Sequence, residues 1–271
     1  MSGPPTAQDV LVERRADGIA IVTLNRPARL NAVTRESLTL LNLTLDCLAQ
    51  DRECRAVIIT GAGRGFCSGL DLDAANKRNA EGSTGAIDKL YWQEHFAGLG
   101  GRLRAMPKLV VAAVNGPAVG VGMALALSAD VRIAAPSARF LVASVRLGIS
   151  AGESGISYLL PRLIGAGRAF DILLTGRPVE AQEAERIGLV LRLTEADNLV
   201  ADALGYATTV LGNSPFSVAQ TKKLMWENLD AGYSSAVGAE NLTQILGTMT
   251  RDYAEAAAAF VEKRPPRFEG R

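Results

Sequence analysis

One carboxylate, Glu153, lies between small residues and an apolar run in the stretch LGISAGESGISYLLPRLIG, residues 147–165. An unpaired carboxylate in such a setting loses hydration, so it is usually a helix cap, a paired group, or a working acid or base. As a first-turn residue it would be favoured by the helix dipole, with Gly152 and Gly155 shaping the turn. As a catalytic group it would need desolvation by its apolar neighbours, which opposes the effect of the dipole. The local sequence leaves both interpretations open.

Two glycine-rich loops could stabilise a negative oxygen with backbone N–H groups alone. The first is Cys67-Ser68-Gly69, which follows the apolar run AVIIT, and the second is Gly120-Val121-Gly122, before the predicted helix MALALSA. A helix N-terminus presents unpaired amides and the positive end of the helix dipole. Together the two loops could form an oxyanion hole, although either one alone is more often a tight turn.

Two short matches to a hydrolase nucleophile have little support elsewhere in the chain. GISAG (148–152) fits the G-x-S-x-G elbow and GFCSG (65–69) fits its cysteine analogue. The single histidine, His95, precedes Ser150, whereas the base of an α/β-hydrolase follows its nucleophile. We therefore expect Cys67 to be a small residue in a tight turn. We expect His95 to be an ordinary helix residue, with a place in a substrate pocket as the alternative.

Signals for dinucleotides, metals and nucleic acids are weak or missing. GAGRGF has Phe66 where a dinucleotide-binding loop carries its third glycine. One histidine, with no HExxH motif and no close cysteine pair, predicts no metal site. The formal net charge is +1 and the basic residues are scattered, which argues against a nucleic-acid partner.

Composition indicates a globular protein without a membrane span. The chain has 271 residues, of which 48% are hydrophobic and 21% charged, enough for one large core or a core with a small appendage. Residues 109–129 carry no charge and could cross a bilayer, but Asn115, Gly116 and Pro117 break the run into a buried strand, a turn and a helix. Three cysteines and a first segment, MSGPPTAQDV, without the features of a secretory signal favour the cytoplasm.

Alternating strands and helices are expected to position the two loops. A hairpin with Asp17-Gly18 at its turn precedes a helix capped by Thr34 or Asn31, and RAVIITG (55–61) follows as a buried strand. Further elements are a helix at 87–106, a strand, turn and helix over 109–129, a strand at 131–134, and helices at 180–188, 198–211, 214–229 and 252–263. The polar segment 73–85 should contain a loop at 81–85. This order predicts an α/β core followed by helices.

Four motifs, in this order along the chain, resemble the crotonase superfamily, the enoyl-CoA hydratase/isomerase family. They are LNRPARLNAV (24–33), GRGFCSGLDL (63–72), VNGPAVGVGMALALSADVRIA (114–134) and LTGRPVEAQEAERIGLV (174–190). The resemblance implies a crotonase-like spiral of ββα units with the acyl-CoA site over residues 1–200 and a C-terminal helical region over 201–271. It also implies a homotrimer or homohexamer that uses a CoA thioester as substrate and no further cofactor.

The same resemblance assigns the residues of the ligand channel. The thioester carbonyl would lie between the backbone amides of Ser68 and Val121. Arg26 and Arg29 are candidate phosphate contacts, and Asp71 is expected to hold the loop after the first donor. The remaining channel residues implied by the resemblance are Leu30, Gly69, Leu70, Leu72, Gly122 and Ser144.

The chain departs from the hydratase pattern at two positions. The two glutamates of family hydratases are replaced by Ala124 and Ser144, so water addition by a pair of carboxylates is in doubt. Glu153 instead aligns with a functional aspartate of the family's dienoyl-CoA isomerases and 4-chlorobenzoyl-CoA dehalogenases. We therefore expect Glu153 to be a single acid/base in isomerisation, an atypical hydration or a retro-aldol type cleavage. The alternative is a non-catalytic acyl-CoA binding protein with the same fold.

Overall fold

The main sheet of the protein has six strands in the order β1-β2-β3-β4-β6-β9. This arrangement comes from a computed structural model that describes residues 9–80 and 85–270. The strands are β1 Val10–Arg14, β2 Ile19–Leu24, β3 Ala56–Gly61, β4 Leu109–Val114, β6 Val131–Ala134 and β9 Arg192–Leu193. β1 and β2 form the expected antiparallel hairpin, with Gly18 at a φ of +84° in its turn, and the other neighbours are parallel. A positive φ favours glycine, which explains the Asp-Gly pair.

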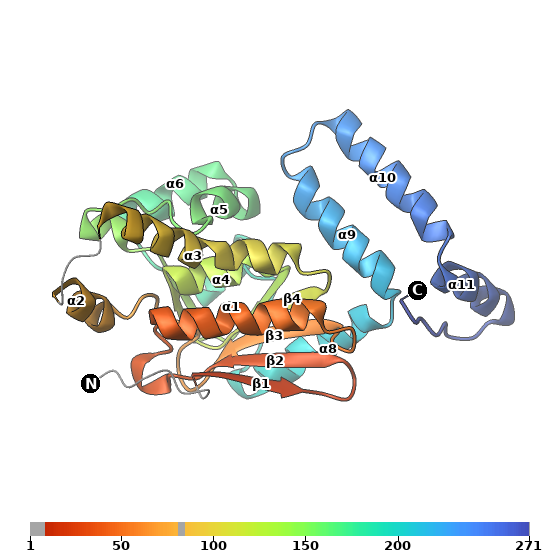
Figure 1. Ribbon diagram of the computed structural model, residues 1–271, viewed down its shortest axis with the longest axis horizontal. Coiled ribbons are helices and arrows are strands. Elements are labelled where there is room, and N and C mark those ends of the chain that lie inside the picture. Colours follow the sequence, from red (N-terminus) through yellow and green to blue (C-terminus); the bar gives the residue numbers. More distant parts are fainter. Residues whose placement is uncertain (1–8, 81–84, 271) are drawn as a thin grey trace.

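Strands β3 and β4 are buried at every residue because helices cover both faces of the sheet. Side chains alternate between faces along a strand. Val57 and Val110 join the core beneath α1 Arg35–Gln50, α3 Ala86–Ala105 and α4 Val121–Ser128, whereas Ile58 and Val111 join the core beneath α8 Leu199–Leu211. Figure 1 shows α1 and α3 lying along one side of the sheet. The uninterrupted apolar runs in the sequence are therefore interior strands.

A small second sheet carries the loop that leads into α4. Its strands are β5 Pro117–Val119, β7 Arg139–Leu141 and β8 Val179–Glu180, in the order β5-β7-β8. The apolar run 109–129 is thus divided into β4, β5 and α4. A strand, a turn and a helix were predicted here, and the short strand β5, which begins at Pro117, was not. Among the described residues, no helix has both the length and the apolar character needed to cross a bilayer.

Most predicted helices occur close to their expected bounds. Helix α1 begins after Thr34, which forms a capping box with Ser37. The polar segment 73–85, for which no helix was predicted, overlaps the helix α2 Leu72–Ala80. The predicted loop at 81–85 lies mostly outside the described residues. The first segment, used above to argue against a signal peptide, also lies largely outside them. The remaining helices of the core are α5 Ile156–Ile164, α6 Ala166–Thr175 and α7 Ala181–Arg186.

The C-terminal helices extend away from the sheet. α9 Pro215–Asn228, α10 Tyr233–Thr248 and α11 Arg251–Glu262 project to one side of the core in Figure 1, and α10 had not been identified as a separate helix. Lys222 anchors α9, because its ammonium group donates to the carbonyls of Leu103 and Lys108 and pairs with Asp130 at 2.8 Å. α8 packs against the sheet, so a division after residue 200 would pass through this helix.

Candidate active site

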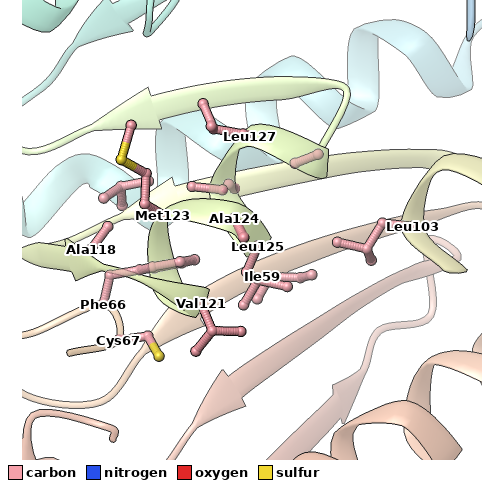
Figure 2. Packing of buried hydrophobic residues seen from close by; sticks show 14 of the residues in the cluster. Ile59, Phe66, Cys67, Leu103, Ala118, Val121, Met123, Ala124, Leu125 and Leu127 are labelled. Atoms are coloured by element: carbon pink, nitrogen blue, oxygen red, sulfur yellow. The ribbon is translucent and has the colours of Figure 1, made fainter. Parts of the chain in front are cut away.

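The two glycine-rich loops predicted to form an oxyanion hole are in contact. The Val119 amide donates to the Cys67 carbonyl at 2.8 Å, and the Cys67 amide donates to Pro117 at 3.0 Å. A Cβ on Gly122 would lie 2.1 Å from the Cys67 carbonyl oxygen, so only glycine fits there. Figure 2 shows Cys67 beside Val121, the first residue of α4. The tertiary structure therefore brings together two segments that lie about fifty residues apart.

The expected donor Ser68 is already bonded within the protein. Its amide donates to the Leu30 carbonyl at 2.9 Å, and its hydroxyl donates to the Arg29 carbonyl at 3.2 Å. This corrects the expectation that the Ser68 amide is available to a ligand. Within the described residues, the amides of Leu70 and Val121 donate to no protein acceptor. Both N–H groups are therefore available to a negative oxygen.

Gly69, which precedes the Leu70 amide, lies close to the segment that leads into the second loop. Gly69 has a φ of +96°, and a Cβ on it would lie 3.0 Å from the Val119 carbonyl oxygen. Both the left-handed backbone and the close approach favour glycine at this position. Leu70 pairs with Val33 in an isolated parallel bridge, which fixes the chain on either side of the free amide. The first loop is therefore held on the 30–33 segment and against β5 at once.

Arg26 faces inward and forms an ion pair with Asp71. Its guanidinium lies 3.0 Å from the Asp71 carboxylate and also donates to the Ala32 carbonyl. Burial acts to raise the pKa of Asp71, but hydrogen bonds from the Ala74 amide and Arg26 outweigh it and leave the pKa below its ordinary value. Asp71 holds the loop, as expected. The expectation that Arg26 contacts a phosphate is not supported, because its donors are committed to the protein.

Arg29, Leu30 and Leu72 lie around the rim of this region. Arg29 is exposed and pairs at 3.1 Å with Asp73, which is also exposed. Its guanidinium can exchange that partner for a phosphate at little cost, because an exposed ion pair contributes little stability. Leu30 has a φ of +49° and accepts the Ser68 amide, while Leu72 begins α2 with a largely exposed side chain.

Two asparagines that sequence reasoning did not identify as site residues organise the loops. The Asn31 side chain accepts the Arg26 amide at 2.8 Å and donates to the carbonyls of Ala62 and Gly65. The Asn115 side chain accepts the Gly61 amide at 3.1 Å and also donates to Gly65, at 3.1 Å. Both side chains thus bind the turn after β3. The available signal was an asparagine in two of the four motifs, in LNAV and VNGP.

Glu153 does not cap a helix. Helix α5 begins at Ile156 after Gly155, and no side chain caps it. Glu153 lies in the loop before it, where Ser154 has a φ of +47° and Gly155 a φ of +83°. Two consecutive left-handed residues place a sharp turn between Glu153 and the first turn of α5, which contains no acidic residue. The dipole-stabilised interpretation of Glu153 is therefore wrong for this conformation.

The Glu153 carboxylate instead lies next to the second glycine loop. Ser144 donates its hydroxyl hydrogen to Glu153 Oε1 at 3.0 Å. The same oxygen lies 3.4 Å from the position that a Cβ on Gly120 would occupy. Gly120 immediately precedes Val121, whose amide is free, so the carboxylate and one candidate oxyanion donor share one small region. Ser144, at one of the two positions where family hydratases are expected to carry a glutamate, is thus hydrogen-bonded to Glu153.

Ala124, at the other of these two positions, cannot take part in proton transfer. Ala124 is 3% exposed within α4 and packs among apolar side chains, as Figure 2 shows. A methyl group there can neither accept nor donate a proton. The structure therefore offers Glu153 as the carboxylate beside the oxyanion loops, with an alanine and a serine at the hydratase positions.

The alternative nucleophile and base do not meet. Cys67 is fully buried, and burial raises the pKa of its thiol to about 11, which keeps it protonated and unreactive. His95 lies between α3 and α1, where Nε2 is 3.3 Å from the Thr39 hydroxyl and 3.4 Å from the Asn42 side-chain nitrogen. It is thus a helix-packing residue, as expected. Within residues 9–80 and 85–270, no three His, Cys, Asp or Glu side chains gather as a metal site would require.

Comparison with known proteins gives consistent results along the chain. The family model described as enoyl-CoA hydratase/isomerase matches residues 14–271. A probable enoyl-CoA hydratase of Mycobacterium bovis is 42% identical over 97% of this chain and 93% of its own length. The 1,2-epoxyphenylacetyl-CoA isomerase of Escherichia coli is 35% identical over 94% of this chain and 96% of its own. An enoyl-CoA hydratase crystal structure from Bacillus anthracis superposes with a TM-score of 0.90 at 31% identity, covering 97% of this chain and 100% of that one.

Proposed function

Because the chain belongs to the enoyl-CoA hydratase/isomerase family, we propose that this acyl-CoA enzyme isomerises its substrate by proton transfer through Glu153. The substrate is a CoA thioester whose carbonyl oxygen accepts hydrogen bonds from the Leu70 and Val121 amides. Arg29 contacts the phosphates of CoA from the rim of the site. No cofactor beyond the thioester itself takes part in this proposal.

The two amides lower the barrier to proton removal. Loss of a proton next to a thioester places negative charge on the carbonyl oxygen. One preorganised donor at such an oxygen contributes roughly 3–4 kcal/mol to the transition state. The Val121 amide also lies at the positive end of α4, an eight-residue helix, which adds a favourable field. The enolate is therefore accessible to a base of ordinary strength.

The carboxylate then determines the reaction. A hydratase that uses two carboxylates can activate water with one and protonate the substrate with the other. Here Ala124 and Ser144 leave Glu153 as the carboxylate beside the second loop, because the Asp71 carboxylate beside the first loop is paired with Arg26. One carboxylate can remove a proton from one carbon of the acyl chain and return it to another, which moves a double bond without net consumption of protons. The position of Glu153 beside Gly120 is the observation that carries this proposal.

We also propose that the protein forms a homotrimer or homohexamer. The C-terminal helices α10 and α11 and the residues between them carry large apolar side chains with high exposure, among them Leu242 at 63%, Ile245 at 63%, Met249 at 77% and Phe260 at 85%. An apolar surface of this kind on a projecting arm usually marks an interface. A second copy of the chain would cover it.

Solvent deuterium exchange tests the proposed chemistry directly. The protein is incubated with acyl-CoAs of several chain lengths in D₂O, and deuterium at the carbons next to the thioester is followed by NMR. Glu153→Gln should lower the exchange rate by about 10²-fold or more, because it removes a general base while keeping side-chain volume. The control is Glu13→Gln, the same change at an exposed residue of β1.

The outcomes separate the possible functions. Crotonyl-CoA hydration should be roughly 10²–10⁴-fold slower than in a hydratase that has both glutamates, because the second carboxylate is missing. Ordinary hydratase turnover would show that the catalytic residues have been misassigned. Binding of acyl-CoA without any exchange or turnover would identify a non-catalytic binding protein. An exchange rate that Glu153→Gln leaves within about threefold would mean that the base lies elsewhere.

A further inference from the structure

Ser144 is buried, and its hydroxyl is directed at Glu153. The residue is 8% exposed and begins a 3-10 turn, Ser144–Leu147. The backbone of the turn is fixed, because the Arg146 amide donates to Ala143 at 2.9 Å and the Ile149 amide donates to Ser144 at 3.1 Å. These bonds fix the point on the backbone from which the Ser144 side chain extends.

The contact between Ser144 and Glu153 occupies one carboxylate oxygen and leaves the other free. The hydroxyl donates to Oε1 at 3.0 Å. Within the described residues, Oε2 has no hydrogen-bond partner and Glu153 forms no ion pair. Oε1 is also the oxygen nearer to the second glycine loop, since it lies 3.4 Å from the position that a Cβ on Gly120 would occupy. The two oxygens of this carboxylate are therefore not equivalent.

From this asymmetry we propose that Ser144 is the positioning residue of the reaction, which holds Oε1 so that Oε2 alone exchanges protons with the substrate. The inference rests on the proposed function of Glu153. In the first step a C–H bond of the acyl chain breaks, its electron pair enters the enolate, and the proton bonds to Oε2. In the second step that O–H bond breaks and the proton returns to a different carbon.

A serine suits this role because it can serve both states of the carboxylate. Its hydroxyl donates to the ionised form, and after rotation it can accept from the protonated form. A second carboxylate at residue 144 would instead bring a like charge within hydrogen-bond distance of Glu153 and disfavour ionisation of both. Replacement of a glutamate by Ser144 thus converts a paired-carboxylate site into one with a single oriented base.

Within the described residues, the Ser144 hydroxyl is the hydrogen-bond donor that contacts the Glu153 carboxylate. Helix α4, on the Gly120 side, has no ionisable side chain. Arg146 in the same turn donates to the Thr175 carbonyl at 3.4 Å. Arg162 on α5 pairs with Asp230 at 2.9 Å. These two arginines are therefore engaged elsewhere, and Ser144 is the side chain that contacts the Glu153 carboxylate.

Ser144→Ala tests the proposal in the full-length protein. The variant loses one hydrogen bond to a charged group, so kcat should fall by roughly 10- to 100-fold while KM changes little. The acid limb of the kcat profile should move to higher pH, because the ionised carboxylate loses a donor. Ser144→Thr keeps the hydroxyl and should restore part of kcat and return the limb toward its original position.

Ser150→Ala is the matched control within the same loop. The Ser150 hydroxyl accepts the Gly152 amide at 3.0 Å and makes no contact with Glu153, so its removal should leave the acid limb in place. If Ser144→Ala lowers activity with an unmoved limb, or lowers only thermal stability, Ser144 is structural and the inference fails. If Glu153→Gln abolishes exchange while Ser144→Ala matches the wild type, the inference fails but the proposed function stands. If Glu153→Gln itself is active, the proposed function fails.

Discussion

Replacing Arg26 by methionine would show whether its ion pair with Asp71 holds the oxyanion loop. Methionine keeps an unbranched apolar side chain and removes the guanidinium. In the protein that group lies 3.0 Å from the Asp71 carboxylate, which is only 7% exposed. The variant would leave this carboxylate buried, with the Ala74 amide at 3.2 Å as its remaining close donor.

The expected loss of stability follows from these contacts. Removing one partner of a fully buried ion pair costs about 3–5 kcal/mol. Arg26 is 17% exposed and the Ala74 donor remains, so the penalty is smaller here. We expect the free energy of unfolding to fall by about 2–3 kcal/mol, since water and one donor partly compensate the carboxylate. The loop that carries the Leu70 amide should also loosen, which raises KM for acyl-CoA.

The effect should depend on pH in a defined direction. The pKa of Asp71 is lowered in the folded protein, so the ionised form is favoured by folding. A group of this kind contributes stability that is fully present above its unfolded pKa, about 3.9, and is lost as pH falls through its lower folded value. The difference between wild type and Arg26→Met should therefore be constant near neutral pH and shrink below about pH 4.

Urea unfolding at equal protein concentration measures both effects, with Arg29→Met as the control. Arg29 is 58% exposed and pairs with an exposed carboxylate, so its loss should change stability by less than about 0.5 kcal/mol. It should instead weaken acyl-CoA binding severalfold at low salt and less at high salt. An unchanged urea midpoint for Arg26→Met, together with lost CoA affinity, would show that the Arg26–Asp71 ion pair does not hold the loop. It would instead identify Arg26 as a phosphate ligand.

Three further predictions concern other parts of the chain. Burial raises the pKa of Cys67 to about 11 and also raises the pKa of Cys54, whereas Cys47 is exposed. A disulfide reagent near pH 8 should therefore react rapidly with one thiol, that of Cys47, in the native protein and with three thiols after denaturation. Asp252→Ala should cost about 3 kcal/mol or more by urea unfolding, because the 2% exposed carboxylate accepts the Ser214 hydroxyl and the amides of Glu269 and Gly270; an unchanged midpoint would show that the tail is not held there. Ile245→Asp on α10 should reduce the mass measured by light scattering from an oligomer toward a monomer, and a wild-type monomer at micromolar concentration would contradict the proposed assembly.

Local patterns in the sequence were sufficient for most elements of the core. The Asp17-Gly18 turn, the Thr34 cap and the apolar run that forms β3 depend on residues within a few positions of one another. Such signals act through backbone preference and burial, which are readable without the fold. Helix α2 was missed because its residues are polar, and α10 because its apolar side chains remain exposed in the single chain.

The chemistry of the site was only partly determined by the sequence. The motifs identified the two loops, the vacated positions Ala124 and Ser144, and Glu153. They did not indicate that the Ser68 amide is bonded to Leu30, or that Arg26 is bound to Asp71. Hydrogen bonds between residues distant in sequence depend on how loops meet in space. The conformation of a single turn can therefore decide which backbone amide is left without an acceptor.

Only the tertiary structure decided what Glu153 contacts. In sequence the residue stands near the start of a helix, where a carboxylate is commonly a dipole-stabilised group. The left-handed backbone at Ser154 and Gly155 separates it from the first turn of α5, and the Ser144 hydroxyl lies 3.0 Å from its carboxylate. A carboxylate's role is set by the donors and the dielectric around it, and these come here from residues nine and thirty-three positions away, at Ser144 and Gly120.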